Sequence, residues 1–305
     1  MTSQRCALVT GATGFIGSHL TRRLVMEGWR VHIFVRPRSN LHLLNNLQGK
    51  ITLHVLNGYT EQICNIMTTV KPDAVFHLAS LFLVQHEIKD VEQLIQSNLC
   101  FPTQLLEAMA NNGVDRLINT GTSWQHFENR HYSPVNLYAA TKQALEAIIQ
   151  YYVETAGLKV ITLKLFDTYG PNDPRLKLVN LLLNTARTEQ PLLMSSGEQF
   201  IDLVHVDDVI SAYITAMELL YDQKFTGHKT FSVKTGQFIK IKDFVELFEK
   251  IICKKLDIRW GEKPYRPREV MKPWKEGDLL PGWEPRISLE RGISDLLKSC
   301  NRGPE

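Results

Sequence analysis

The feature that most constrains this chain is a regular alternation of short β-branched runs with longer amphipathic stretches. Six runs predict strands: CALVT at 6–10, RVHIFV at 30–35, ITLHVL at 51–56, DAVFHLA at 73–79, DRLINT at 115–120 and KVITLKLF at 159–166. Stretches with helical spacing lie between them, at 14–27, 41–47, 60–70, 88–111 and 136–155. Because each parallel crossover needs a helix to return the chain, this order predicts an α/β fold with a parallel sheet covered on both faces.

The alternation breaks after Gly170, which predicts a second unit. Prolines follow at 171, 174 and 191, and later within GEKPYRPREVMKPW at 261–274 and LLPGWEPR at 279–286. We therefore expect residues 1–170 to form the first domain and residues 171–305 a smaller α/β domain. Residues 206–222 have helical apolar spacing and are expected to pack back on the first domain, so the smaller domain would be discontinuous.

Composition excludes several classes of protein. The net charge of +3 comes from 35 basic and 32 acidic residues spread along the chain, which argues against a nucleic-acid partner. No apolar run is long enough for a membrane span, and the first strand begins too early for a secretion signal, so we expect a cytoplasmic protein. The five cysteines show no C-x-x-C spacing and the ten histidines no H-E-x-x-H, so we expect no metal.

Three glycines at positions 11, 14 and 17 lie where the first strand ends and the first helix begins. At such a turn the glycines allow a sharp bend and close approach of a pyrophosphate, and the helix N-terminus offers free N–H groups to the anion. An ordinary glycine-rich turn is the alternative, but the position favours a dinucleotide site in a Rossmann-type, doubly wound sheet. The residues of this turn that we expect at the cofactor are Gly11, Thr13, Gly14, Phe15, Ile16 and Gly17.

The end of the second predicted strand bears on the type of dinucleotide. An acidic residue there would bind the ribose hydroxyls of NAD, whereas this chain has Arg36, followed by Arg38 and Ser39. Guanidinium groups suit a 2′-phosphate, so NADP(H) is favoured over NAD(H). The alternative is that both arginines only solvate a loop.

A tyrosine and a lysine lie four residues apart in NLYAATK, at Tyr138 and Lys142, and would share one face of a helix. A nearby ammonium can lower the pKa of a phenol enough to make it an acid/base catalyst. An exposed helical pair is the alternative. The pair gains weight from LINTGTS upstream, where a strand ends in hydroxyl residues that can present Thr122 or Ser123 to a substrate oxygen.

With these three features in this order, the chain resembles the extended short-chain dehydrogenase/reductase family of nucleotide-sugar enzymes, from VTGATGFIG to PGWEPRISLERGI. The resemblance implies a Rossmann domain with a small C-terminal substrate domain. It implies Thr122 as the hydroxyl that binds the sugar, Tyr138 as the acid/base and Lys142 as the residue that holds the nicotinamide ribose. It implies further cofactor contacts at Asn57, Gly58, Leu78, Ala79, Ser80, Asn98, Thr120 and Phe166. It implies substrate contacts at Ser123, Trp124, Asp167 and Arg266, the last for a diphosphate.

Departures from the family pattern narrow the reaction. Asp167 stands where the family usually has asparagine, and Ile201 where many members have arginine. Ser123 and Trp124 replace the Asp-Glu pair of the 4,6-dehydratases, so water elimination lacks its carboxylates and is disfavoured. The short segment before Tyr138, with SWQH, VNLYAATK and LFDTYGPND, is most similar to the branch containing CDP-abequose synthase and related 4-keto-6-deoxysugar reductases.

The leading hypothesis is an NADPH-dependent 4-ketoreductase of a nucleotide-linked 4-keto-6-deoxyhexose, in which Tyr138 protonates the carbonyl oxygen. A nucleotide-sugar 4-epimerase with retained NAD would use the same residues. A non-catalytic dinucleotide-sensing scaffold on the same fold is the third alternative. Family members often dimerise through a four-helix arrangement, which here would use residues 88–111 and 136–155, and we expect a homodimer.

Overall fold

The structure is a computed structural model that describes residues 4–301. Its first unit is built on a seven-stranded sheet in the order β11-β6-β5-β4-β1-β2-β3, and all of its strand pairs are parallel. Its strands are β1 (Cys6–Thr10), β2 (Arg30–Val35), β3 (Ile51–Val55), β4 (Ala74–His77), β5 (Arg116–Thr122), β6 (Lys159–Leu165) and β11 (His228–Val233). The strand order reverses between β1 and β4, where doubly wound sheets open a crevice at their carboxyl ends. The predicted Rossmann-type fold is confirmed.

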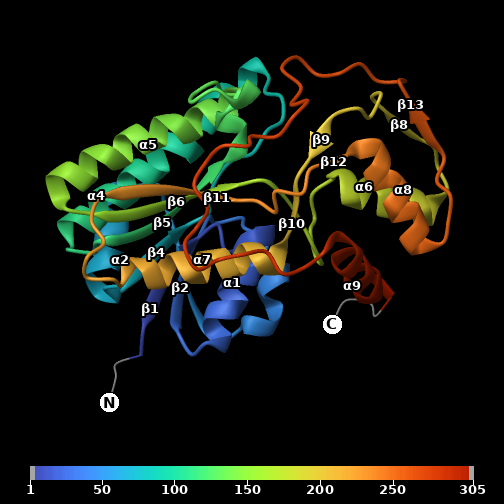
Figure 1. The fold of residues 1–305 in the computed structure, drawn as a ribbon. Coiled ribbons are helices and arrows are strands. Elements are labelled where there is room, and N and C mark those ends of the chain that lie inside the picture. Colours follow the sequence, from blue (N-terminus) through green and yellow to red (C-terminus); the bar gives the residue numbers. More distant parts are fainter. Residues whose placement is uncertain (1–3, 302–305) are drawn as a thin grey trace.

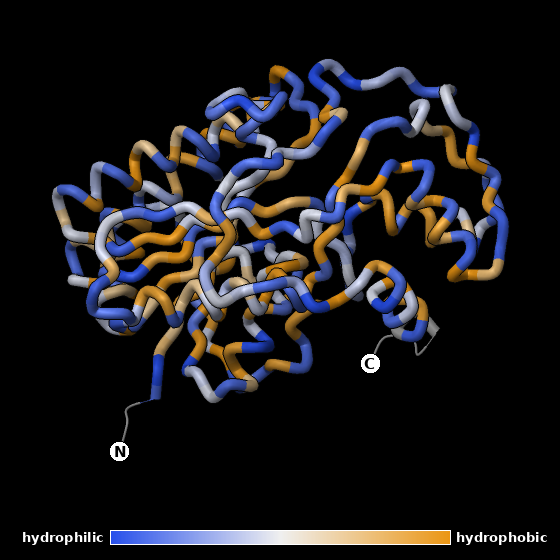
Figure 2. Tube along the Cα trace, viewed as in Figure 1, coloured by the Kyte–Doolittle hydropathy of each residue, from blue (hydrophilic) through white to orange (hydrophobic). Residues whose placement is uncertain are grey.

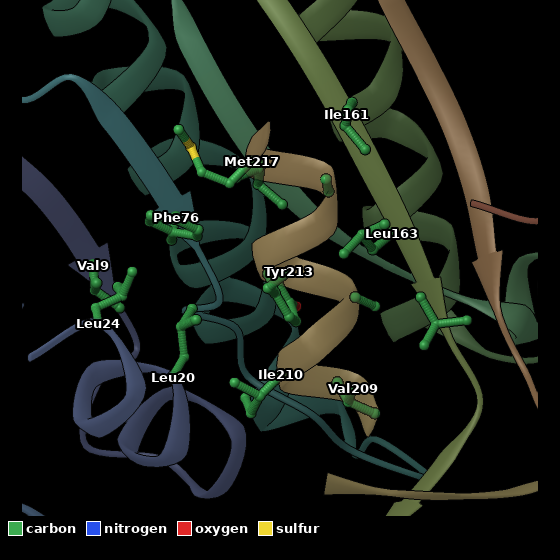
Figure 3. Packing of buried hydrophobic residues seen from close by; sticks show 14 of the residues in the cluster. Val9, Leu20, Leu24, Phe76, Ile161, Leu163, Val209, Ile210, Tyr213 and Met217 are labelled. Atoms are coloured by element: carbon green, nitrogen blue, oxygen red, sulfur yellow. The ribbon is translucent and has the colours of Figure 1, made fainter. Parts of the chain in front are cut away.

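Helices cover both faces of this sheet (Figure 1). Helices α1 (Phe15–Met26) and α7 (Val206–Leu220) share one apolar cluster with the sheet, and α2 (Thr60–Val70), α4 (Phe101–Asn111) and α5 (Leu137–Ala156) share the other. Figure 3 shows the first cluster, in which Ile210, Tyr213 and Met217 of α7 lie close to Leu20 of α1 and Phe76 of β4. The central strands are buried throughout because helices cover both of their faces.

The strand β11 corrects the expected range of the smaller domain. It lies within residues 171–305, yet it pairs with β6 at the edge of the large sheet. Its sequence, HKTFSV, begins with three polar residues and therefore lacks the high apolar content by which the other strands were predicted. Residues 228–233 thus belong to the first unit together with α7.

The smaller domain joins three helices to three short strand pairs (Figure 1). The helices are α6 (Leu178–Thr188), α8 (Ile241–Ile252) and α9 (Leu289–Asn301). The strand pairs are β7 (Asp167–Tyr169) with β10 (Leu203–His205), β9 (Phe200–Ile201) with β12 (Ile239–Lys240), and β8 (Leu192–Met194) with β13 (Ile258–Trp260). A separate core that includes Leu182, Phe244 and Ile293 holds this domain together, and Figure 2 shows apolar residues along its helices. No helix within residues 4–301 is long and apolar enough to cross a membrane.

The stretch 88–111, predicted as one helix, changes its winding along its length. A 3₁₀ turn at Ile88–Asp90 leads into α3 (Val91–Ile95), then a π-helical turn at Gln96–Cys100, then α4. Pro102 has no N–H to donate to the preceding turn, and a wider turn accommodates this loss. The π-helical turn carries Asn98, which is buried beside the end of β4.

Candidate active site

Two cavities meet at the carboxyl ends of the strands. The inner cavity, of about 220 Å³, lies between the glycine turn, the ends of β4 and β5, and the start of α5. The outer cavity, of about 470 Å³, lies between these strand ends and the smaller domain. The two cavities share lining residues and therefore adjoin, and together they are called the cleft below. The shared wall consists of Phe82, Ser123, Trp124, Phe166, Asp167, Thr168 and Lys177.

The glycine turn lines the inner cavity with Gly11, Gly14 and Gly17. Gly11 has φ +72°, and a Cβ there would lie 2.6 Å from the backbone nitrogen of Ala79. A Cβ at Gly17 would lie 2.1 Å from the carbonyl oxygen of Gly11, so the turn closes this tightly only with glycine. Gly14 begins α1 without a side-chain cap, and the first turn holds no acidic residue, so its N–H groups remain open to an anion.

The end of β4 is fixed by a buried asparagine. Asn98 accepts hydrogen bonds from the Ser80 hydroxyl and the Leu81 N–H, at 3.1 and 2.7 Å. It donates to the Leu81 carbonyl and to Thr141 of α5. Leu78 and Ser80 line the inner cavity, whereas Asn98 anchors them from behind. The predicted contact at Asn98 is therefore a support for the cavity wall in this structure.

Helix α5 carries Tyr138 and Lys142 into the inner cavity. Asn136 caps the helix by accepting the Ala139 N–H at 2.9 Å, so that Tyr138 lies in the first turn. The Tyr138 ring meets Phe82 edge to face at 5.0 Å between centroids. The Lys142 Nζ lies 5.9 Å from the centre of the Tyr138 ring, on the same side of the helix. Both side chains are buried.

The electrostatics of this pair correct one expectation. We expected the Lys142 ammonium to lower the pKa of Tyr138, but burial raises the pKa of the phenol, and the opposing charge is the guanidinium of Arg175. Burial also lowers the pKa of Lys142 to about 8, against a raising contribution from Glu146. The two pKa shifts have the same physical cause, because desolvation disfavours the charged form of each group. Tyr138 is therefore protonated at neutral pH, as a proton donor must be.

The end of β5 presents Thr122 at the inner cavity. Its Oγ1 accepts the Trp124 N–H at 3.3 Å, and its own N–H donates to Gln125 Oε1 at 3.0 Å. Thr122 and Gln125 form a capping box that fixes the turn Ser123–Gln125. Because Oγ1 accepts from the backbone, its hydrogen remains available to a substrate oxygen. Thr120 lines the same cavity and bonds to the His77 carbonyl.

The predicted substrate residues lie at the outer cavity. Ser123, Trp124 and Asp167 belong to the shared wall, and Arg266 lines the outer cavity. Asp167 Oδ1 accepts a hydrogen bond from Lys177 Nζ at 3.1 Å. Arg266 lies with its Cζ 5.8 Å from the centre of the Trp124 ring and donates to both carboxylate oxygens of Glu269. That carboxylate raises the pKa of Arg266, which keeps its positive charge.

Several predicted cofactor residues do not line either cavity. Arg36 and Ser39 close a turn after β2, in which the Ser39 hydroxyl accepts the Arg36 N–H at 3.0 Å. This turn lies one strand from the glycine turn, because β2 pairs with β1. The predicted residues outside both cavity walls are Thr13, Arg36, Arg38, Ser39, Asn57, Gly58, Ala79 and Asn98. Phe15, Ile16 and Phe166 line the inner cavity.

The cleft side chains that sequence reasoning missed include Phe82, His126, Arg175, Lys177 and Trp274. Arg175 lies 4.7 Å from the centre of the Phe15 ring, bound to Asp173 and to the Thr168 carbonyl. The segment NDPRLKL at 172–178 held a signal for Arg175 and Lys177, because these two cations follow the expected end of the first domain. Nothing in the local pattern marks Phe82, His126 or Trp274, which tertiary contacts bring to the cleft.

Comparison with known proteins identifies the family. The sequence profile of the NAD dependent epimerase/dehydratase family matches residues 7–226. The chain belongs to this family. It is 26% identical to CDP-abequose synthase of Salmonella muenchen over 293 residues, which cover 95% of this chain and 96% of that protein.

Solved structures of nucleotide-sugar epimerases share its fold. UDP-glucose 4-epimerase of Thermotoga maritima, solved with UDP-glucose, has a TM-score of 0.86 at 24% identity, covering 98% of this chain and 100% of that one. UDP-glucose 4-epimerase of Thermus thermophilus, in complex with NAD, has a TM-score of 0.83 at 22% identity, with 98% and 100% coverage. The inner cavity fits a dinucleotide, since an uncapped helix N-terminus and a turn of close-packed glycines face it. The family and this cavity together indicate an NAD(P)-dependent enzyme.

Proposed function

We propose that the protein is an NADPH-dependent 4-ketoreductase of a nucleotide-linked 4-keto-6-deoxyhexose. The observation that carries the proposal is that Thr122, Tyr138 and Lys142 line one cavity with the glycine turn, beside a larger cavity suited to a nucleotide sugar. The likeness to CDP-abequose synthase over 95% of the chain supports a sugar substrate of this class. Bound NADPH would supply the hydride that reduces the C4 carbonyl.

The side chains of the inner cavity supply the proton and its environment. The burial that raises the pKa of Tyr138 keeps its proton until a substrate carbonyl develops negative charge. Tyr138 Oη then donates that proton to the C4 oxygen. Thr122 Oγ1 donates a hydrogen bond to the same oxygen and orients it. The Arg175 guanidinium, which lowers the pKa of Tyr138, stabilises the tyrosinate that remains, and the Lys142 ammonium on the same side of α5 would hold the nicotinamide ribose.

The outer cavity supplies the contacts for a nucleotide sugar. Its walls carry large aromatic rings, among them Trp124 and Trp274, which suit the apolar faces of a base or a deoxysugar. Lys177 and Arg266 line it as cations paired with Asp167 and Glu269, and their remaining N–H donors suit a diphosphate. The rings also exclude water from the carbonyl, which strengthens the interaction between the C4 oxygen and its two hydrogen-bond donors.

The preference for NADPH rests on the turn after β2. Arg36 and Arg38 are exposed there, one strand from the glycine turn, and a 2′-phosphate beside them would make charge-assisted hydrogen bonds. A homodimer is part of the same proposal. Ile88, Ile95 and Tyr151 are exposed on the helical segments that would form its interface, and analytical ultracentrifugation at micromolar protein tests it.

The experiment that tests the reaction is NADPH oxidation with CDP-, dTDP- and GDP-linked 4-keto-6-deoxyhexoses. We expect one NADPH consumed for each sugar reduced. The second candidate is a nucleotide-sugar 4-epimerase, which the fold shared with the UDP-glucose 4-epimerases favours. An epimerase returns the hydride to the sugar, so product that accumulates without net NADPH oxidation identifies it. Tight NADPH binding with no turnover of any sugar would refute both.

A further inference from the structure

A cation is buried on β6, beside the cleft but outside the catalytic group. Lys164 is 4% exposed, although lysine is almost never buried without a partner. Its neighbour in the β5–β6 register is Gly121, and a Cβ there would lie 3.0 Å from Lys164 Cγ and 3.1 Å from Gln125 Oε1. Gly121 therefore leaves room for the two side chains to pass along the strand. The absence of a side chain at Gly121 is thus what makes room for Lys164.

The hydrogen bonds of Lys164 define the protonation state and the tautomer of His126. Lys164 Nζ lies 2.8 Å from His126 Nε2 and 3.4 Å from Glu146 Oε1 of α5. An ammonium only donates, so His126 Nε2 accepts and His126 Nδ1 carries the hydrogen, which it donates to the Arg130 carbonyl at 3.2 Å. Burial and the Lys164 charge lower the pKa of His126 to about 4, in agreement with a neutral ring.

The same carboxylate connects this lysine to the turn that carries Thr122. Glu146 Oε1 also accepts from Gln125 Nε2 at 2.8 Å, and Gln125 Oε1 accepts the Thr122 N–H at 3.0 Å. Gln125 is fully buried. An unbroken set of hydrogen bonds and one ion pair thus runs from Thr122 through Gln125 and Glu146 to Lys164 and His126. Gln125 thus binds the turn to α5, the helix that carries Tyr138, and His126 binds it to β6.

The network also reaches the wall of the outer cavity. The His126 ring stacks on Trp274 at 3.9 Å between centroids and 13° between planes, and both side chains line the outer cavity. Lys164 Nζ lies 5.7 Å from the centre of the same indole ring. A change at Lys164 would therefore move the orienting hydroxyl and the aromatic wall together, without touching the substrate.

We propose that Lys164, His126 and Glu146 form a positioning unit that sets Thr122 and the Trp274 wall relative to Tyr138. The expected effect of this unit on kcat rests on the proposed reduction, whereas its expected effect on the turn Ser123–Gln125 does not. Misplacement of a reacting group by about 1 Å can cost on the order of a hundredfold in rate. We therefore expect Lys164→Met to lower kcat by roughly ten- to a hundredfold while the KM for NADPH changes little.

The test compares three variants of the full chain, Lys164→Met, Lys164→Arg and Lys159→Met. Lys159 is the matched control, since it lies on the same strand and pairs with Asp115 at 3.9 Å, away from the cleft. Two quantities are measured: kcat and KM with NADPH and CDP-4-keto-6-deoxyglucose, and hydrogen–deuterium exchange without ligands. Exchange is followed at the amides of Phe127, Ser133 and Val135, whose hydrogen bonds join residues 124–127 to residues 133–135.

The expected result is faster exchange of these amides and a lower kcat in Lys164→Met, recovery of both in Lys164→Arg, and no change in Lys159→Met. Unchanged exchange in Lys164→Met overturns the proposal whether or not the wild type reduces any sugar. Faster exchange with an unchanged kcat also overturns it, because the unit would then be structural only. If Lys164→Met does not fold, His126→Phe takes its place, since it keeps a ring on Trp274 and removes the acceptor. A wild type without turnover refutes the proposed reduction, and the exchange measurement then decides the positioning of the turn.

Discussion

Replacing Lys142 with methionine should stabilise the fold while abolishing activity. Lys142 is 2% exposed, and burial lowers its pKa from 10.5 to about 8. At 1.36 kcal/mol for each pKa unit, holding this ammonium in the folded protein costs about 3 kcal/mol near neutral pH. Methionine fills a similar volume without a charge, so removing the cost raises the free energy of unfolding by up to that amount.

The size of the effect is measurable by thermal unfolding. A chain of 305 residues has an unfolding entropy of about 0.6 kcal/mol/K, so about 3 kcal/mol corresponds to a rise in Tm of about 5 °C. Lys159→Met serves as the control, because its ion pair with Asp115 is partly exposed and is worth at most about 1 kcal/mol. Removing that pair leaves Tm nearly unchanged or slightly lower.

The pH dependence identifies the cause of the gain. Below about pH 8 both the folded and the unfolded chain carry the Lys142 proton, so the wild type bears the full cost. Between about pH 8 and the ordinary lysine pKa of 10.5 the unfolded chain binds more protons, so wild-type stability rises with pH and the advantage of Lys142→Met shrinks. A Tm at pH 7 equal to or below that of the wild type, or a gain that does not change with pH, would refute the reasoning.

Three further predictions concern the same site. Turnover should fall as pH rises through about 8, because the Lys142 ammonium is lost. Glu146→Gln should move that fall to lower pH, because the Glu146 charge raises the pKa of Lys142. A fall at the same pH in the kcat/KM profile of the variant contradicts this. Gly17→Ala should weaken NADPH binding at least about tenfold in titration calorimetry, since its Cβ would lie 2.1 Å from the Gly11 carbonyl oxygen, and an unchanged Kd would contradict the close-packed turn. Arg36→Glu should reduce the ratio of NADPH to NADH affinity by at least about tenfold, and equal loss for both cofactors would show that this turn does not contact the 2′-phosphate.

The fold was readable because its signals are local. Strands β1 and β6 are buried on both faces and are rich in apolar and β-branched residues, although β6 also carries the buried Lys164. The glycine turn was equally plain, since Gly11 and Gly17 meet other backbone at distances that only glycine allows. The edge strand β11 lacks this character, because four of its six residues are polar, and its place in the sheet depends on pairing with β6.

The candidate site was readable only in part. Spacing on one helix predicts that Tyr138 and Lys142 share a face, and the structure brings both to the inner cavity. Spacing does not report burial, and burial is what raises the pKa of the phenol and lowers that of the ammonium. The stack of His126 on Trp274 joins residues that are far apart in the chain, so no local pattern could indicate it.

The most direct test of the central claim is the rate of NADPH oxidation by Tyr138→Phe with a 4-keto-6-deoxyhexose that the wild type reduces. Phenylalanine keeps the ring against Phe82 and removes only the proton that the account gives to the C4 oxygen. Loss of a general acid costs about 10²- to 10⁴-fold, so we predict less than about 1% of the wild-type rate with an unchanged Kd for NADPH. Retention of about a tenth or more of the wild-type rate would contradict the account, since the proton would then come from another group.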